Sequence, residues 1–255
     1  MISSTLGIVF LALVGGIVPT LIWLFFWLYE DQKRPEPTRV ILQAFLVGCL
    51  AVIVAFFLER PFLAILGPLT GSSIGFSFNL GAILFIISQS KLILTWSLIE
   101  ETVKYLGAQI SVLEKPDFDE PVDAMIYLIT VALGFAAMEN ALFLFETLSK
   151  GHSDVYFLLT GHLRFLGATV VHTVSSSLVG AAIALTYYKP FWTKAWAVAV
   201  GLLAATLLHA FFNFFIINND GAATAQVLLL LWLAAIFIIF LFERVKVITR
   251  RSPTA

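Results

Sequence analysis

The residues that could carry chemistry lie within the most hydrophobic part of the chain. Positions 98–107 read LIEETVKYLG, which places two adjacent glutamates and a lysine in an apolar segment. An ionisable side chain near the centre of a bilayer costs at least a few kcal/mol, so it faces the interior of a helix bundle and is a candidate for function. The candidates in this and the next three apolar segments are Glu100, Glu101, Lys104, Glu139, Asn140, Arg164, His172, Ser176, His209 and Asn213.

Helical spacing predicts which of these side chains share a face. Residues four apart are neighbours on a helix surface, so Glu100 is predicted to pair with Lys104, whereas Glu101 points elsewhere. Arg164 lies about two turns before His172 on nearly the same face. The same spacing of four relates His172 to Ser176 and His209 to Asn213.

Depth in the membrane groups one carboxylate with two imidazoles. At about 1.5 Å per residue, Glu100, His172 and His209 all fall in the middle part of their segments, nearer the outer leaflet. The sequence therefore predicts that these three side chains meet inside the bilayer. Such an arrangement suits a buried catalytic or metal site.

Two chemical routes fit this set, and both hydrolyse an amide. In the first, a glutamate takes a proton from a water that attacks a carbonyl, while His209 and Asn213 stabilise the oxyanion. In the second, Glu100, His172 and His209 bind Zn²⁺, which activates the water. No HExxH motif is present. We therefore prefer the first route and expect that no cofactor is required, with zinc as the alternative.

The composition shows which elements must position these residues. The chain has 255 residues, is 60% hydrophobic and 12% charged, and has a mean hydropathy of +0.98, whereas a soluble domain averages about 45–50% apolar and about 25% charged. This predicts an all-α, polytopic transmembrane bundle. Since one span needs about 20 apolar residues, we expect about seven spans, near 6–28, 40–58, 92–112, 124–145, 163–187, 195–217 and 225–242.

Residues 61–90 do not fit this pattern clearly. They combine the stretch GPLTGSSIG with a short apolar run, and could form a re-entrant segment, an interfacial segment or the start of a long tilted helix. We expect residues 1–255 to form a single integral membrane domain. Within it, 92–217 would be a catalytic four-helix core, and 218–255 the last span with a basic tail.

The distribution of basic residues predicts the orientation. With seven spans, ten lysines and arginines fall on one side and three on the other, and cytoplasmic loops carry the excess of such residues. This places the N-terminus outside and the C-terminus in the cytoplasm. The first set is Lys33, Arg34, Arg39, Lys115, Lys189, Lys194, Arg244, Lys246, Arg250 and Arg251, and the second is Arg60, Lys91 and Lys150.

Four motifs in register resemble the PrsW family of intramembrane proteases, which is distantly related to the CAAX prenyl and bacteriocin-immunity membrane proteases. They are EExxK at 100–104, DEPVDAMIY at 119–127 running into GFAAMEN at 134–140, RFLGATVVHTVSSSLVG at 164–180 and HAFFN at 209–213. The resemblance covers about residues 95–215.

The resemblance implies roles for these residues. Glu100 would be the water-activating base, Glu101 its orienting partner, and His209 and Asn213 the oxyanion donors, with His172 completing the site. Glu139 is also expected in the catalytic set. Supporting or substrate-binding roles are expected for Lys104, Asn140, Arg164 and Ser176.

The resemblance also implies a setting and a substrate class. The protein would be a multi-pass protein of a prokaryotic plasma membrane. Its partners would be the lipid bilayer and a membrane-embedded protein, such as a single-pass anti-sigma factor in stress signalling, with no nucleic acid. Two alternatives stay open. One is a proton-coupled membrane transporter, although the internal repeats typical of transporters are not seen. The other is a catalytically silent relative that binds membrane proteins.

Overall fold

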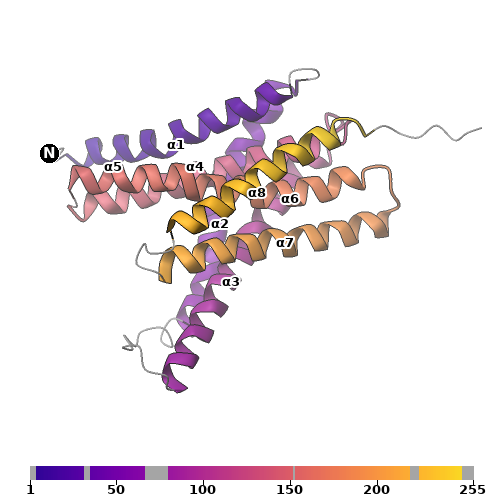
Figure 1. The fold of residues 1–255 in the computed structure, drawn as a ribbon. Coiled ribbons are helices and arrows are strands. Elements are labelled where there is room, and N and C mark those ends of the chain that lie inside the picture. The colour runs from indigo at the N-terminus through magenta and orange to yellow at the C-terminus, as the bar shows by residue number, and fades with distance from the viewer. Residues whose placement is uncertain (1–3, 32–34, 67–79, 152, 219–223, 249–255) are drawn as a thin grey trace, which may run out of the picture.

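The computed structural model describes residues 4–31, 35–66, 80–151, 153–218 and 224–248, and these form an all-α bundle (Figure 1). Residues 109–113 and 164–168 are π-helical turns, and the second of them joins two α-helices into one continuous helix. The elements are α1 (Thr5–Glu30), α2 (Thr38–Leu66), α3 (Leu80–Ala108), η2 (Gln109–Leu113), α4 (Asp123–Ser149), α5 (Asp154–Leu163), η3 (Arg164–Ala168), α6 (Thr169–Leu185), α7 (Phe191–Asn218) and α8 (Thr224–Val245).

Helix α4 is the centre of the bundle. Every residue from 123 to 137 is buried, and α1, α2 and α6 pack around it. In Figure 1 the ribbons of α1, α4, α6, α7 and α8 run roughly side by side, whereas α3 crosses them steeply. A helix that is apolar on all sides is buried on all sides, so α4 is the scaffold on which the other helices rest.

Glycines let α2 and α4 touch backbone to backbone. A Cβ atom on Gly48 would lie 2.0 Å from the carbonyl oxygen of Val131, and one on Gly134 would lie 2.0 Å from that of Phe45. Helices in membranes associate through small residues of this kind, because lipid provides no hydrophobic force between them. The crossing of α2 and α4 therefore depends on the absence of side chains at two positions.

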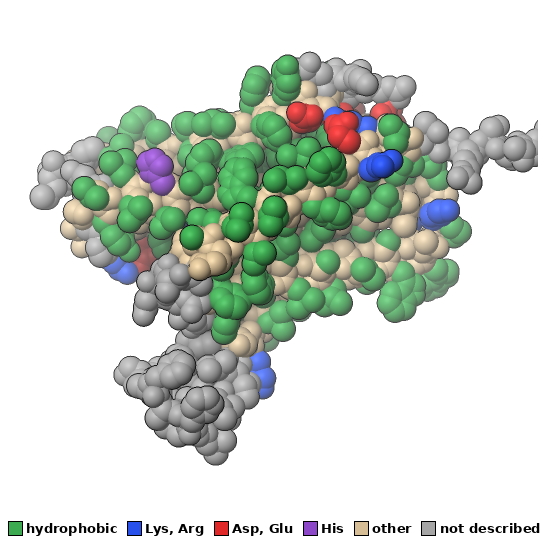
Figure 2. All heavy atoms as spheres, viewed as in Figure 1, with side chains coloured by type: hydrophobic (Ala, Val, Ile, Leu, Met, Phe, Trp, Pro, Cys, Tyr) green, Lys and Arg blue, Asp and Glu red, His purple; other side chains and the backbone are tan. Residues whose placement is uncertain are grey.

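The outside of the bundle is apolar. Figure 2 shows hydrophobic side chains over most of the visible face, with acidic and basic side chains gathered toward its ends. Among the described residues, six helices are long and apolar enough to cross a membrane, namely α1, α2, α4, the continuous helix α5–η3–α6, α7 and α8. The predicted all-α, multi-span class is confirmed.

Several predicted boundaries are wrong. The second segment does not end at Leu58 but continues as a helix through Pro61 to Leu66. The third helix begins at Leu80, about twelve residues before the predicted span, so residues 80–90 form the start of a long helix, which is one of the alternatives left open for this segment. It is not among the six apolar helices found in the described residues, and its second half carries Glu100, Glu101 and Lys104. Residues 67–79 of the ambiguous segment lie outside the described residues.

Candidate active site

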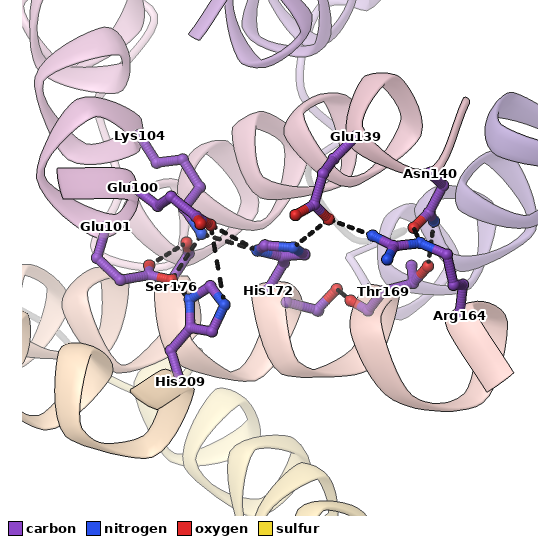
Figure 3. Close-up of polar contacts among 11 residues, drawn as sticks. Glu100, Glu101, Lys104, Glu139, Asn140, Arg164, Thr169, His172, Ser176 and His209 are labelled. Carbon is purple, nitrogen blue, oxygen red and sulfur yellow. Dashed lines mark hydrogen bonds and ion pairs between the residues drawn. The ribbon is translucent and has the colours of Figure 1, made fainter. Parts of the chain in front are cut away.

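Four helices bring a charged cluster together in the bundle interior (Figure 3). Helix α3 supplies three of its members, and α4, α6 and α7 supply one each. The charged side chains of α3 point toward His172 on α6 and His209 on α7 (Figure 3). The members are Glu100, Glu101, Lys104, Glu139, His172 and His209, and all except the half-buried Glu139 are at most 8% exposed.

Three of these side chains form a set of candidate metal ligands. Glu100 Oε2 lies 3.9 Å from His172 Nδ1 and 3.8 Å from His209 Nε2, and all three atoms are within 4.8 Å of one another. Glu100 Oε2 is buried and makes no hydrogen bond. Two imidazoles and one glutamate are a ligand set known from catalytic zinc sites. A cation between them would give the isolated oxygen a partner, so the residues present fit a metal ion.

Two further carboxylates orient the imidazoles. His209 Nδ1 lies 2.8 Å from Glu101 Oε1, and His172 Nε2 lies 3.1 Å from Glu139 Oε2. A carboxylate accepts hydrogen bonds, so these outer ring nitrogens carry the proton and the inner nitrogens present lone pairs toward Glu100. A histidine that binds a metal typically donates its other N–H to a carboxylate in this way.

Lys104 lies between Glu101 and His172. Its Nζ is 2.6 Å from Glu101 Oε1, 3.0 Å from His172 Nδ1 and 4.8 Å from the centroid of the Phe135 ring. The predicted pairing with Glu100 is therefore wrong: the lysine pairs with Glu101, three residues before it. An ammonium proton and a metal ion cannot use the same lone pair of His172 Nδ1, so Lys104 has to give way where a metal binds.

The remaining predicted residues lie at different distances from the cluster. Ser176 Oγ donates to Glu101 Oε2 at 3.1 Å. Arg164 donates through Nε to Asn140 Oδ1 and through Nη2 to Glu139 Oε2. Asn213 is half-buried and, within the part of the chain that the structure describes, has no hydrogen bond to the other predicted residues.

One contributor was missed by the sequence reasoning. The Phe135 ring lies under both Lys104 and His172, with its centroid 5.3 Å from that of the imidazole. It shares a face of α4 with Glu139, four residues later, and it belongs to the same GFAAMEN motif. That spacing was the available signal.

Comparison with known proteins agrees with this geometry. Residues 36–242 match the family model described as PrsW family intramembrane metalloprotease. The chain is 24% identical over 209 residues to Protease PrsW of Bacillus subtilis (strain 168), covering 80% of this chain and 82% of that protein. The chain is 25% identical over 228 residues to Protease PrsW of Oceanobacillus iheyensis, and the aligned region covers 88% of this chain and 93% of that protein. It is 29% identical over 130 residues to Protease PrsW of Geobacillus kaustophilus, and this alignment covers 51% of this chain and 50% of that protein. No solved structure matches the chain.

The family description corrects one expectation. We expected that no cofactor would be required, because the chain has no HExxH motif. The match is to a metalloprotease family, and Glu100, His172 and His209 form a buried group that could hold a metal ion. The motif is missing because the candidate ligands come from three different helices, so they leave no local spacing in the sequence. The preference for a metal-free site is therefore wrong.

The family match covers most of the chain, and the relatives named above are bacterial. Together with the six apolar helices, it establishes a multi-pass integral membrane protein that is a peptidase. The chain belongs to the PrsW family of intramembrane metalloproteases.

Proposed function

We propose that the protein hydrolyses a peptide bond of a membrane-embedded protein, at a site where Glu100, His172 and His209 hold a divalent metal ion, most simply zinc. The observation that carries this proposal is the buried, unpartnered Glu100 Oε2. It faces two imidazole nitrogens at 3.8 and 3.9 Å, and carboxylates hold the opposite nitrogens of both rings.

The site's own residues prepare this chemistry. A bound zinc ion would act as a Lewis acid that activates water and polarises a peptide carbonyl. Glu101 and Glu139 hold the rings of His209 and His172 so that their lone pairs face inward. Lys104 compensates the charge of Glu101, which would be costly to bury alone. The near-complete burial of Glu101, Lys104 and the two histidines keeps bulk water away from them.

We assign supporting roles to the residues around this set. Ser176 fixes the second oxygen of Glu101, and Asn140 holds Arg164. Asn213 lies one turn after His209 on α7, where a side-chain amide can donate a hydrogen bond to a substrate carbonyl. All these residues come from 92–217, which supports treating that segment as the catalytic core.

We propose seven spans, with α3 as the seventh, and an external N-terminus. Residue contacts place the ends of α1, α6 and α8 and the starts of α2 and α4 at one end of the bundle, because Lys246 contacts Glu30, Tyr127 contacts Glu36 and Tyr187 contacts Phe118. The start of α1 and the end of α8 lie toward opposite ends of the bundle in Figure 1. Cytoplasmic loops are rich in lysine and arginine, and Arg39, Lys115, Lys189 and Lys194 belong to this end.

The position of the site along the helices bears on the substrate. His172 precedes the end of α6 by 13 residues. At about 1.5 Å per residue, it lies roughly 20 Å from the proposed cytoplasmic end of a hydrocarbon core about 30 Å thick, and Glu100 contacts it there. This depth supports cleavage in the outer half of the membrane. We propose a single-pass membrane protein as substrate, an anti-sigma factor being the class that the sequence resemblance implies.

The test compares the N-termini of membrane proteins in host cells that express wild-type protein, Glu100→Gln, His209→Ala or the control Lys150→Gln at equal levels. Lys150 forms an exposed ion pair at the end of α4. We expect new N-termini near the outer membrane boundary with the wild type and the control, and none with the site variants. Identical profiles from all four inserted proteins would refute the proposal and favour a transporter or a silent binding protein.

A further inference from the structure

We propose that Arg164 is a positioning residue, which holds Glu139 so that Glu139 fixes the ring of His172 toward the metal site. This inference rests on the proposed metal-dependent function. It differs from the expectation that Arg164 binds substrate, because its guanidinium is engaged by the protein itself.

One oxygen atom links the arginine to the histidine. Arg164 Nη2 donates to Glu139 Oε2, and the same Oε2 lies 3.1 Å from His172 Nε2. Figure 3 shows the three side chains in a row, with Glu139 in the middle. Because the side chain of Glu139 is 33% exposed, it would have room to turn away from His172 if the arginine did not hold it.

Arg164 is in turn held in place on α4. Its Nε donates to Asn140 Oδ1, and its guanidinium lies over the Phe143 ring, 4.5 Å from the centroid. Asn140 Nδ2 donates to Thr169 Oγ1 at 3.0 Å. The side chain of Arg164 is only 15% exposed. A planar guanidinium with several fixed donors is suited to such a role, so the arginine is a rigid support for Glu139.

The π-helical turn explains how Arg164 and His172 reach the same carboxylate. Eight residues of regular α-helix advance by two turns and about 80° more, so regular spacing alone does not give the nearly shared face that we expected from the sequence. The turn η3, Arg164–Ala168, uses more residues per turn and so reduces this offset. Trp232 Nε1 donates to the carbonyl of Leu166 within it. Such turns occur frequently at functional sites.

The experiment measures zinc affinity without substrate. Purified protein in detergent competes with a chromophoric chelator for Zn²⁺, using wild type, Glu139→Gln, Arg164→Gln, the double variant and the control Lys150→Gln. Loss of a carboxylate that orients a ligating histidine typically weakens metal binding about 10- to 100-fold. We expect that range for Glu139→Gln and about a tenfold loss for Arg164→Gln. The double variant should bind no more weakly than Glu139→Gln, because Arg164 acts through Glu139.

Three results separate the inference from the function on which it rests. If Arg164→Gln bound zinc as tightly as the wild type, or if the two losses multiplied in the double variant, the inference would be overturned while the metal site stood. If the wild type itself bound no zinc, the proposed metal site would fail first. Should Arg164→Gln not fold, Arg164→Lys replaces it in the same cycle, because it keeps a cation near Glu139 but lacks the planar fork. It is expected to bind zinc with intermediate affinity.

Discussion

Two lysine–glutamate pairs in this protein have the same length and opposite surroundings. Lys104 Nζ and Lys150 Nζ each lie 2.6 Å from a glutamate oxygen of their own helix, in Glu101 and Glu146 respectively. The side chains of the first pair are fully buried, whereas those of the second are 62% and 61% exposed. The distance alone would therefore predict that the two pairs contribute equally to stability.

The surroundings give the two pairs different roles. An exposed pair contributes about 0–1 kcal/mol, because water and ions screen it. A buried pair costs much desolvation, and removing one partner leaves an uncompensated charge. Glu101 also accepts hydrogen bonds from Ser176 and His209. The buried pair is therefore part of the candidate site, whereas the exposed pair is a feature of the surface.

The largest expected difference comes from removing the buried cation. Lys104→Met should lower the free energy of unfolding by about 3–5 kcal/mol, because the Glu101 charge stays buried without its partner. Unfolding in mixed detergent micelles, followed by circular dichroism, measures the change. A loss below about 1 kcal/mol would mean that the two pairs differ in exposure but not in energy.

A double replacement separates stability from function. Glu101→Gln with Lys104→Met should recover about 2 kcal/mol relative to Lys104→Met, because position 101 no longer carries a buried charge without its partner. The glutamine oxygen can still accept from His209 Nδ1, but a neutral acceptor forms a weaker hydrogen bond than a carboxylate. Zinc affinity should therefore stay about tenfold or more below that of the wild type. Full recovery of zinc binding would show that the charge of Glu101 is not needed.

A third carboxylate, that of Asp31, lies outside the spans and tests how burial affects the pKa of a carboxyl group that forms no ion pair with another described residue. Asp31 follows α1 and is 5% exposed, and its Oδ2 has no hydrogen-bond partner. Burial, and then the nearby Glu36, raise the pKa of Asp31 from 3.8 to about 6. The folded state thus binds the proton more tightly than the unfolded state, so stability should fall as the pH rises from about 4 to about 6.

Allowing for screening by water, this change should be about 1 kcal/mol. Asp31→Asn should abolish this part of the pH dependence, as measured by the same unfolding assay between pH 4 and pH 7. A variant whose pH dependence matched that of the wild type would assign the effect to other groups.

The smallest effect is expected at the exposed pair. Lys150→Gln should change the free energy of unfolding by at most about 0.5 kcal/mol. This difference should become still smaller in 1 M salt, where the screening length of exposed charges falls to about 3 Å. A larger, salt-resistant loss would contradict the distinction drawn between the two pairs.

Periodicity predicted much of the fold but not the rotation of its helices. The apolar segments were long enough to be recognised, and six of them are helices of spanning length. Spacings of three and four both place residues on one helix face, so the sequence could not tell whether Lys104 pairs with Glu100 or Glu101. That choice depends on how α6 and α7 pack against α3, which brings His209 to Glu101.

Contacts between distant segments were also beyond local patterns. The distance in sequence between Glu139 and Arg164 gives no sign that they pair, and the π-helical turn at Arg164 has no composition that distinguishes it from its neighbours. Similarly, an HExxH search detects only ligands on one helix, so its failure carried less information about a metal than we assigned to it.

The central place of α4 has a consequence for how the chain is made. Helix α1 packs mainly on α4, which begins 93 residues after α1 ends. At a synthesis rate of about 5–20 residues per second, the first span emerges roughly 5–20 seconds before its principal partner. During this interval Gly16 of α1, whose Cβ position lies 2.5 Å from the carbonyl of Ala137 in the finished protein, faces lipid or the insertion machinery. The rate of translation therefore limits how early α1 can pack against α4. A translational pause before residue 123 would lengthen the time during which α1 lacks this partner.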